Sequence, residues 1–160
     1  MSQSIAQIDL LESPRCKPSS YIKSERDGAI KELLEENCFQ PVQDNVGPYK
    51  LKFSIQDHRL VIEVENAEGE ALPASKVSLR PYKRIIKDYF LMVESYNNAR
   101  YHGGDKLEAI DMGRRAVHNE GSEMLEKSLS SKIKIDLATA RRLFTLICVM
   151  HIGQVRGPRI

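Results

Sequence analysis

The chain has 160 residues, of which 41% are hydrophobic and 29% charged, and its formal net charge is +2. These values lie within the range of soluble globular proteins, and no apolar run approaches the roughly 18 residues that a membrane-spanning helix needs. The length predicts a single domain over residues 1–160, with residues 1–7 and 153–160 poorly ordered, and no contact with a membrane.

The cysteines and the start of the chain bear on the cellular compartment. Cys16, Cys38 and Cys148 are scattered, without a close pair, which argues against a disulfide framework and against a cysteine-built zinc site. Cys148 lies in an apolar helical stretch and is expected in the core. The first residues lack the basic start and apolar stretch of a signal peptide, so we expect a cytoplasmic protein.

The first 48 residues predict one strand and one helix. A short edge strand is expected around residues 8–11, followed by a loop with two prolines. A helix is expected at about residues 24–37, because apolar residues recur there at helical spacing and the Ser24 hydroxyl can cap its first turn. The helix should end well before Pro41.

Residues 49–80 change to a period of two, which is typical of strands with one exposed face. The first two strands join at a turn over residues 56–59, and a third ends near residue 79. Lysines on the outer face of the first strand lie opposite glutamates of the second. This stretch predicts an antiparallel meander. Its inward residues are Tyr49, Leu51, Phe53, Ile55, Leu60, Ile62, Val64, Val77 and Leu79.

Three helices follow, at about residues 81–102, 105–129 and 137–152, with a short strand at 133–135 between the last two. Pro81 suits a first helical position, and Asp105 and Asp136 are expected to cap the next helices. The second half of the last helix is apolar nearly all round, so it either completes the core or forms half of a homodimer interface. The fold class is α+β, with an antiparallel sheet of three to four strands packed against helices on one side.

Basic residues crowd the start of the helix at residue 81, although the first half of the chain has a net charge of −3 and the second half +5. A helix N-terminus is already positive, so several cations there suggest a bound anion. The ordinary alternative is a solvated basic turn relieved by Asp88. The candidate anion-binding residues in this turn are Arg80, Lys83, Arg84 and Lys87.

A second polar segment interrupts the apolar stripe of the next helix at residues 111–121. Arg114 or Arg115 can clamp an anion bidentately, while His118 exchanges protons with Glu120 or Glu123. The alternative is an exposed helix face with ion pairs four residues apart, such as Asp111 with Arg115.

Other kinds of site receive little support. The histidines and cysteines lack metal-ligand spacing, so we expect no metal and no cofactor. Tyr82, Tyr89 and Tyr96 repeat every seven residues and can be interpreted as a base-stacking platform. Packing in the core explains aromatic residues at helical spacing better.

Three segments are distinctive: LRPYKRIIKDYF at residues 79–90, AIDMGRR at 109–115 and HNEG at 118–121. Together with residues 33–37, 47–49 and 136–150, they resemble a known family of small, uncharacterised alphaproteobacterial proteins. The first dozen residues and those after His151 do not take part. The resemblance implies a bacterial cytosolic protein, and it brings no catalytic residue or cofactor with it.

The sequence therefore favours a non-catalytic binding or adaptor protein whose two basic segments form one surface, which requires Arg84 and Arg114 to share a face. Its partner would be an anionic small molecule or an acidic protein surface. The alternative is a small enzyme acting on a phosphorylated or carboxylated metabolite, with His118 and Glu120 or Glu123 as acid–base groups. A third reading, RNA binding, is disfavoured by the near-neutral net charge.

Overall fold

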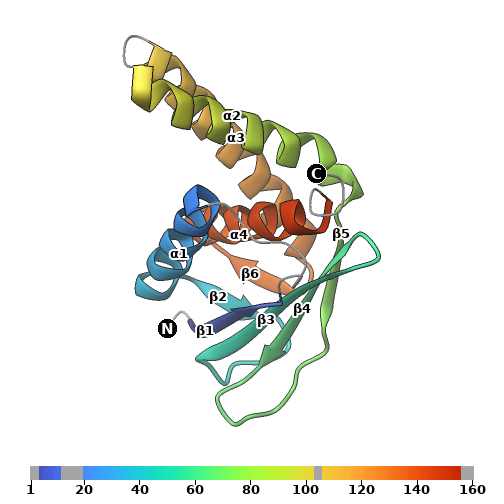
Figure 1. Ribbon diagram of the computed structural model, residues 1–160. Coiled ribbons are helices and arrows are strands. Elements are labelled where there is room, and N and C mark those ends of the chain that lie inside the picture. Colours follow the sequence, from blue (N-terminus) through green and yellow to red (C-terminus); the bar gives the residue numbers. More distant parts are fainter. Residues whose placement is uncertain (1–3, 12–19, 103–105, 156–160) are drawn as a thin grey trace.

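The computed structural model of the protein describes residues 4–11, 20–102 and 106–155. Helices and strands alternate irregularly along the chain (Figure 1). The elements are β1 (Ile5–Leu10), α1 (Ser20–Glu35), β2 (Phe39–Pro41), β3 (Tyr49–Gln56), β4 (Arg59–Glu65), β5 (Ser75–Ser78), a 3-10 turn η1 (Arg80–Tyr82), α2 (Lys83–His102), α3 (Lys106–Leu129), β6 (Ile133–Ile135) and α4 (Leu137–Val155).

The main sheet has the strand order β1-β3-β4-β5. The expected meander is confirmed, since β3, β4 and β5 pair antiparallel in succession. The expectation of a wholly antiparallel sheet is wrong, because β1 pairs with β3 in parallel. A parallel pair needs a long crossover, and α1 and β2 lie between these two strands in the chain. The α+β class holds, with a mixed sheet.

The meander forms as its alternating pattern predicts. Lys50 lies opposite Glu65, and Lys52 lies opposite Glu63, on the exposed face. The turn between β3 and β4 has positive φ at both central residues, Asp57 and His58. Two such residues fit a tight hairpin turn, whose twist matches that of the strands.

A second, two-stranded sheet pairs β2 with β6 antiparallel, with Phe39 opposite Ile135. The short strand β6 was expected, but β2 was not, because Pro41 indicates a break in regular structure. Proline is tolerated at the end of an edge strand, where its missing amide removes no ladder bond. This small sheet links the end of α1 to the start of α4.

The first two elements begin earlier than the sequence indicates. β1 starts at Ile5 rather than near residue 8, so residues 5–7 belong to the main sheet. α1 starts at Ser20, and Ser24 therefore lies inside the helix instead of capping it. The helix also ends at Glu35, two residues before the expected end.

Helices α2 and α3 form an antiparallel hairpin that projects from the rest of the molecule (Figure 1). Tyr82, near the start of the hairpin, bonds to Ser128, near the end of α3, at 2.7 Å. Further along, a side chain at Gly113 would contact Met92 of α2. The predicted cap Asp105 lies outside the described residues.

Helix α4 forms the centre of the core, between α1 and α3 and against the sheet (Figure 1). Every residue from 143 to 150 is buried within the chain, Cys148 included, so the apolar half of this helix completes the core. Asp136 caps α4 as expected, since its Oδ1 accepts the Thr139 amide at 2.8 Å. The helix continues to Val155, three residues beyond its expected end. No helix in the described ranges is long and apolar enough to span a bilayer.

Candidate functional site

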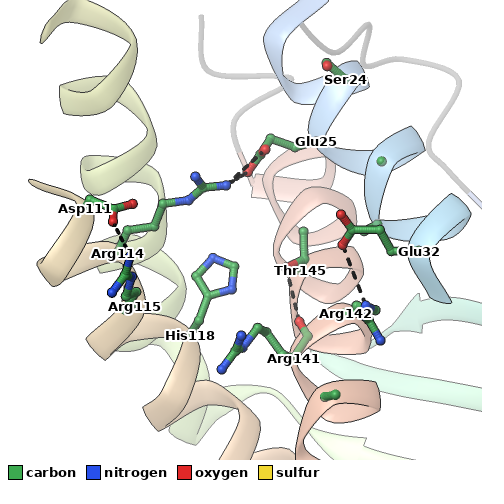
Figure 2. A pocket seen from close by; sticks show the side chains of 13 residues that line it. Ser24, Glu25, Glu32, Asp111, Arg114, Arg115, His118, Arg141, Arg142 and Thr145 are labelled. Carbon is green, nitrogen blue, oxygen red and sulfur yellow. Dashed lines mark hydrogen bonds and ion pairs between the residues drawn. The ribbon is translucent and has the colours of Figure 1, made fainter. Parts of the chain in front are cut away.

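A polar pocket of about 310 Å³ opens between α1, α3 and α4. This volume is at the lower end of the range for small-molecule sites, roughly 300–1,000 Å³. Four arginines and one histidine face three carboxylates across it (Figure 2). The lining residues are Ser24, Glu25, Gly28, Ala29 and Glu32 of α1, Asp111, Arg114, Arg115 and His118 of α3, and Ala138, Arg141, Arg142 and Thr145 of α4.

Helical spacing explains why these side chains converge. On α3, Asp111, Arg114 and His118 are three or four residues apart and therefore lie on one side of the helix. The same spacing aligns Gly28 and Glu32 on α1. Helices α1 and α3 both pack against α4, and each of the three helices contributes polar side chains to the pocket.

Arg114 joins α3 to α1 at one side of the pocket. Its Nη2 lies 3.2 and 3.3 Å from the two carboxylate oxygens of Glu25. The Tyr89 hydroxyl donates a hydrogen bond to the same carboxylate at 2.9 Å. Burial, with the Glu25 charge as the second cause, raises the pKa of Tyr89 well above its ordinary value. Both charged side chains are mostly buried, and the pair therefore links the N-terminal half of α1 to the N-terminal half of α3.

The other three arginines have different partners. Arg115 pairs with Asp111 at 3.0 Å on the exposed side of α3, as the four-residue spacing predicts. Arg142 lies 3.6 Å from Glu32. Arg141 instead donates to the amide oxygen of Asn119 at 3.1 Å. Among the described residues, no carboxylate lies within ion-pair distance of Arg141.

His118 stands at the centre of the pocket (Figure 2). Its ring packs against Tyr89 and Phe144, with centroid distances of 5.5 and 6.3 Å. Its Nε2 is buried and has no hydrogen-bond partner among the described residues. Burial, followed by the charges of Arg114 and Arg141, lowers the pKa of His118 to about 4. The imidazole is therefore neutral at physiological pH.

The basic turn at the start of the α2 region does not line this pocket. Arg84 pairs with Asp88 of its own helix at 3.0 Å and with Glu120 of α3. Glu120 follows Arg114 by six residues, so the two side chains leave α3 about 120° apart. The pocket therefore brings together Arg114, Arg115 and His118, and Arg84 is not part of its lining. The other three cations of the turn, Arg80, Lys83 and Lys87, are also exposed.

The structure also separates the proposed acid–base groups. His118 faces the pocket, whereas Glu120 lies on nearly the opposite side of α3 and pairs with Arg84. Glu123 lines a different, open hollow beside β6. Neither carboxylate can exchange a proton with His118 directly in this arrangement. In the described ranges, no group of three or more histidine, cysteine or acidic side chains could hold a metal ion.

The tyrosine repeat is explained by packing, as expected. Tyr82 and Tyr89 are 1% and 0% exposed, so neither ring is accessible to a nucleobase. Their hydroxyls reach the edge of the core, where they bond to Ser128 and Glu25. The side chain of Tyr96 lies outside the described residues.

Half of the pocket was not predicted from the sequence. Arg114, Arg115 and His118 were candidates, but Glu25, Arg141 and Arg142 were not. The adjacent arginines at 141 and 142 follow closely after the Asp136 cap, and this pair was a signal that could have drawn attention to α4. Glu25 gave no signal, because an acid near the start of a helix is ordinary.

The fold and the pocket together define a small α+β protein with an arginine-lined site between three helices. Residues 2–153 match the model of a family described as an uncharacterised protein family, UPF0262, and the chain belongs to this family. The resemblance that the sequence suggested is confirmed, and the match extends into the first dozen residues, where similarity was not expected.

Several bacterial relatives are similar along most of their length. A UPF0262 protein of Paramagnetospirillum magneticum is 44% identical over 94% of this chain and 96% of its own. Those of Mesorhizobium japonicum and Brucella canis are 52% and 48% identical, each over 81% of this chain and 82% of their own. No solved structure matches the chain.

Proposed function

We propose that this protein binds a small anionic molecule in the pocket between α1, α3 and α4, without a catalytic step of its own. The observation that supports this most is Arg141, which lines the pocket and donates to a neutral amide. The pocket's three other arginines each face a carboxylate. Arg141 is thus the cation that an incoming anion can neutralise without displacing an internal partner.

The charge balance of the pocket supports the same conclusion. Its four arginines exceed its three carboxylates by one, and the low pKa of His118 keeps the imidazole uncharged. The lining therefore has a net positive charge, which favours an anionic ligand over a neutral or cationic one. Because the arginines surround a cavity rather than a protruding face, we favour a small molecule over an acidic protein surface as the partner.

The enzyme alternative rests on an acid–base pair whose members lie on different sides of α3. His118 alone is a neutral base with a buried Nε2, and no second titrating group reaches it from Glu120 or Glu123. RNA binding would use the exposed turn of α2, where Arg84 is engaged by Asp88 and Glu120. We therefore prefer binding in the pocket to either alternative.

We also propose that the protein works in the cytoplasm. The two described cysteines, Cys38 and Cys148, are both free thiols. Free thiols are usual in reducing compartments.

A thermal-shift panel tests the proposal. The wild-type protein is screened with inorganic phosphate, succinate, glucose 6-phosphate, AMP and a short RNA. An anion at about 100 times its dissociation constant adds roughly 2.7 kcal/mol, which is a rise in Tm of about 5–10 °C. The same screen is run on Arg141→Ala and on Arg84→Ala, which serves as the matched control on the outer face.

We expect the shift to vanish in Arg141→Ala and to persist in Arg84→Ala. The proposal fails if none of these anions raises the Tm of the wild type. It also fails if the shift is lost in Arg84→Ala and kept in Arg141→Ala. A shift with the RNA alone, weakened by added salt, would replace the proposal with RNA binding.

A further inference from the structure

Gly28 lies in the middle of α1, where glycine is an unfavourable residue. Glycine in a helix interior is less stable than alanine because the unfolded chain loses more freedom when it folds. The fold supplies no steric reason for this glycine, since a Cβ built on it meets no atom within 4 Å. The two interior glycines of α3 differ, because a Cβ at Gly113 would press on Met92 and one at Gly121 on Phe144.

What Gly28 does face is the pocket. It lines the cavity between Ser24 and Glu32, one helical turn away on either side. Ala29 beside it and Ala138 of α4 also line the pocket and are small, so part of the lining consists of backbone and methyl groups. The charged side chains of α1, α3 and α4 line the same pocket (Figure 2). The open space at Gly28 is therefore part of the volume available to a ligand.

The size of the pocket indicates the class of ligand. Its volume of about 310 Å³ is about ten times the ~30 Å³ share of one water molecule in the liquid. An inorganic ion bound at Arg141 would leave most of this space to water. An organic body attached to the anionic group would fill it and exclude that water.

We infer that the ligand is an organic anion, a carboxylate or a phosphate ester, whose uncharged body lies against the backbone of α1 at Gly28. The inference rests on the proposed function and assigns Gly28 as the residue that determines which anions fit. The anionic group lies at Arg141, and the body extends toward α1. A methyl group at Gly28 would occupy the place of that body.

The substitution Gly28→Ala should therefore have two opposite effects. Without ligand, alanine raises the Tm by about 2 °C, because it favours the helix and meets no neighbour. With ligand, the added methyl group overlaps the organic body and weakens its binding about tenfold. A residue with a purely structural role would change the Tm and leave binding unaltered.

Titration calorimetry of wild type and Gly28→Ala with glucose 6-phosphate, succinate and inorganic phosphate tests this inference. We expect the variant to bind the organic anions about tenfold more weakly, and inorganic phosphate within about twofold of wild type. Lys31→Ala is the control, because Lys31 is exposed on α1 and does not line the pocket. It should leave all three affinities unchanged.

The inference is overturned if Gly28→Ala binds both organic anions as tightly as wild type, if the Tm of Gly28→Ala falls, or if wild type binds inorganic phosphate but neither organic anion. The last result would leave the anion site itself intact. The proposed function fails separately, when no anion binds wild type or when Arg141→Ala binds all of them normally.

Discussion

The two halves of α3 meet their neighbours in opposite ways. In the second half, the helix lies so close to α4 that a Cβ on Gly121 would overlap the Phe144 ring. Arg114 and His118, two turns and about one turn earlier, line a polar pocket between α3 and the helices α1 and α4. One helix thus forms a closed apolar contact and an open charged one.

The same difference explains why the pKa of His118 is low. The imidazole lies where the open region borders the closed one, with Phe144 and Tyr89 on its apolar side and arginines on the other. Its environment disfavours the charged form for both reasons, desolvation first and the arginine charges second. Changes in the open region, in the closed region and at the exposed Arg84–Glu120 pair should therefore affect stability to different extents.

The largest effect on the free energy of unfolding is expected when the pH is lowered from 7 to 4. The pKa of His118 is lowered from 6.5 to about 4 in the folded protein, so the unfolded chain binds a proton between these values that the folded chain does not. Stability associated with this residue is therefore present above pH 6.5 and lost as the pH falls toward 4. We expect a loss of about 2–3 kcal/mol between pH 7 and pH 4 from this group.

Urea unfolding of wild type and His118→Phe at both pH values measures this loss. The variant removes the titrating group and keeps an aromatic ring beside Tyr89 and Phe144. The wild type should lose about 2–3 kcal/mol more than the variant does, since other acid-sensitive groups are common to both. Equal losses in the two proteins would mean that the imidazole is not held neutral by its pocket.

The closed region is tested by Gly121→Ala. The added methyl group forces Phe144 out of its position in the core, which should cost about 2 kcal/mol of unfolding free energy. Gly113→Ala is the matched control, because its Cβ would meet the flexible end of Met92 rather than a ring. We expect a change of less than about 1 kcal/mol there. Both are measured by urea unfolding at pH 7, and similar values would show that the contact at Gly121 is not tight.

A smaller difference in unfolding free energy is expected between two of the ion pairs that join helices, Arg114 with Glu25 and Arg84 with Glu120. Glu25→Gln removes the charge that Arg114 and Tyr89 share in a mostly buried setting, and should cost about 1.5 kcal/mol. Arg84→Ala breaks an exposed pair with Glu120 and should cost about 0.5 kcal/mol or less. Unfolding in 1 M salt, compared with low salt, should lower the second value further. A larger cost for Arg84→Ala would reverse the ranking of the two regions.

Local patterns predicted much of this fold. The alternation over residues 49–80 gave the meander, the apolar stretch of α4 gave the central helix, and Asp136 gave its cap. Each of these depends on neighbours in sequence. The parallel pairing of β1 with β3 depends on contacts across some 40 residues of chain, which short-range periodicity does not encode.

The pocket was half predictable for the same reason. The polar break in α3 identified Arg114, Arg115 and His118 as residues to examine. Their partners lie on α1 and α4, and which of those side chains face them depends on how the helices rotate as they pack. At the start of α2, Arg84 pairs with Asp88, as its spacing allowed, and also with Glu120 of α3, which the sequence of α2 does not indicate. Charge placement along one helix does not reveal the charges that other helices bring.

The central claim is that an anion binds between α1, α3 and α4 and not at the basic turn of α2. Amide chemical-shift mapping by NMR, with glucose 6-phosphate and then succinate titrated into labelled protein, tests it most directly. We predict that the shifts cluster at residues 24–32, 111–118 and 138–145, while residues 80–87 stay unperturbed. Shifts centred on residues 80–87, with the pocket residues unchanged, would contradict the claim.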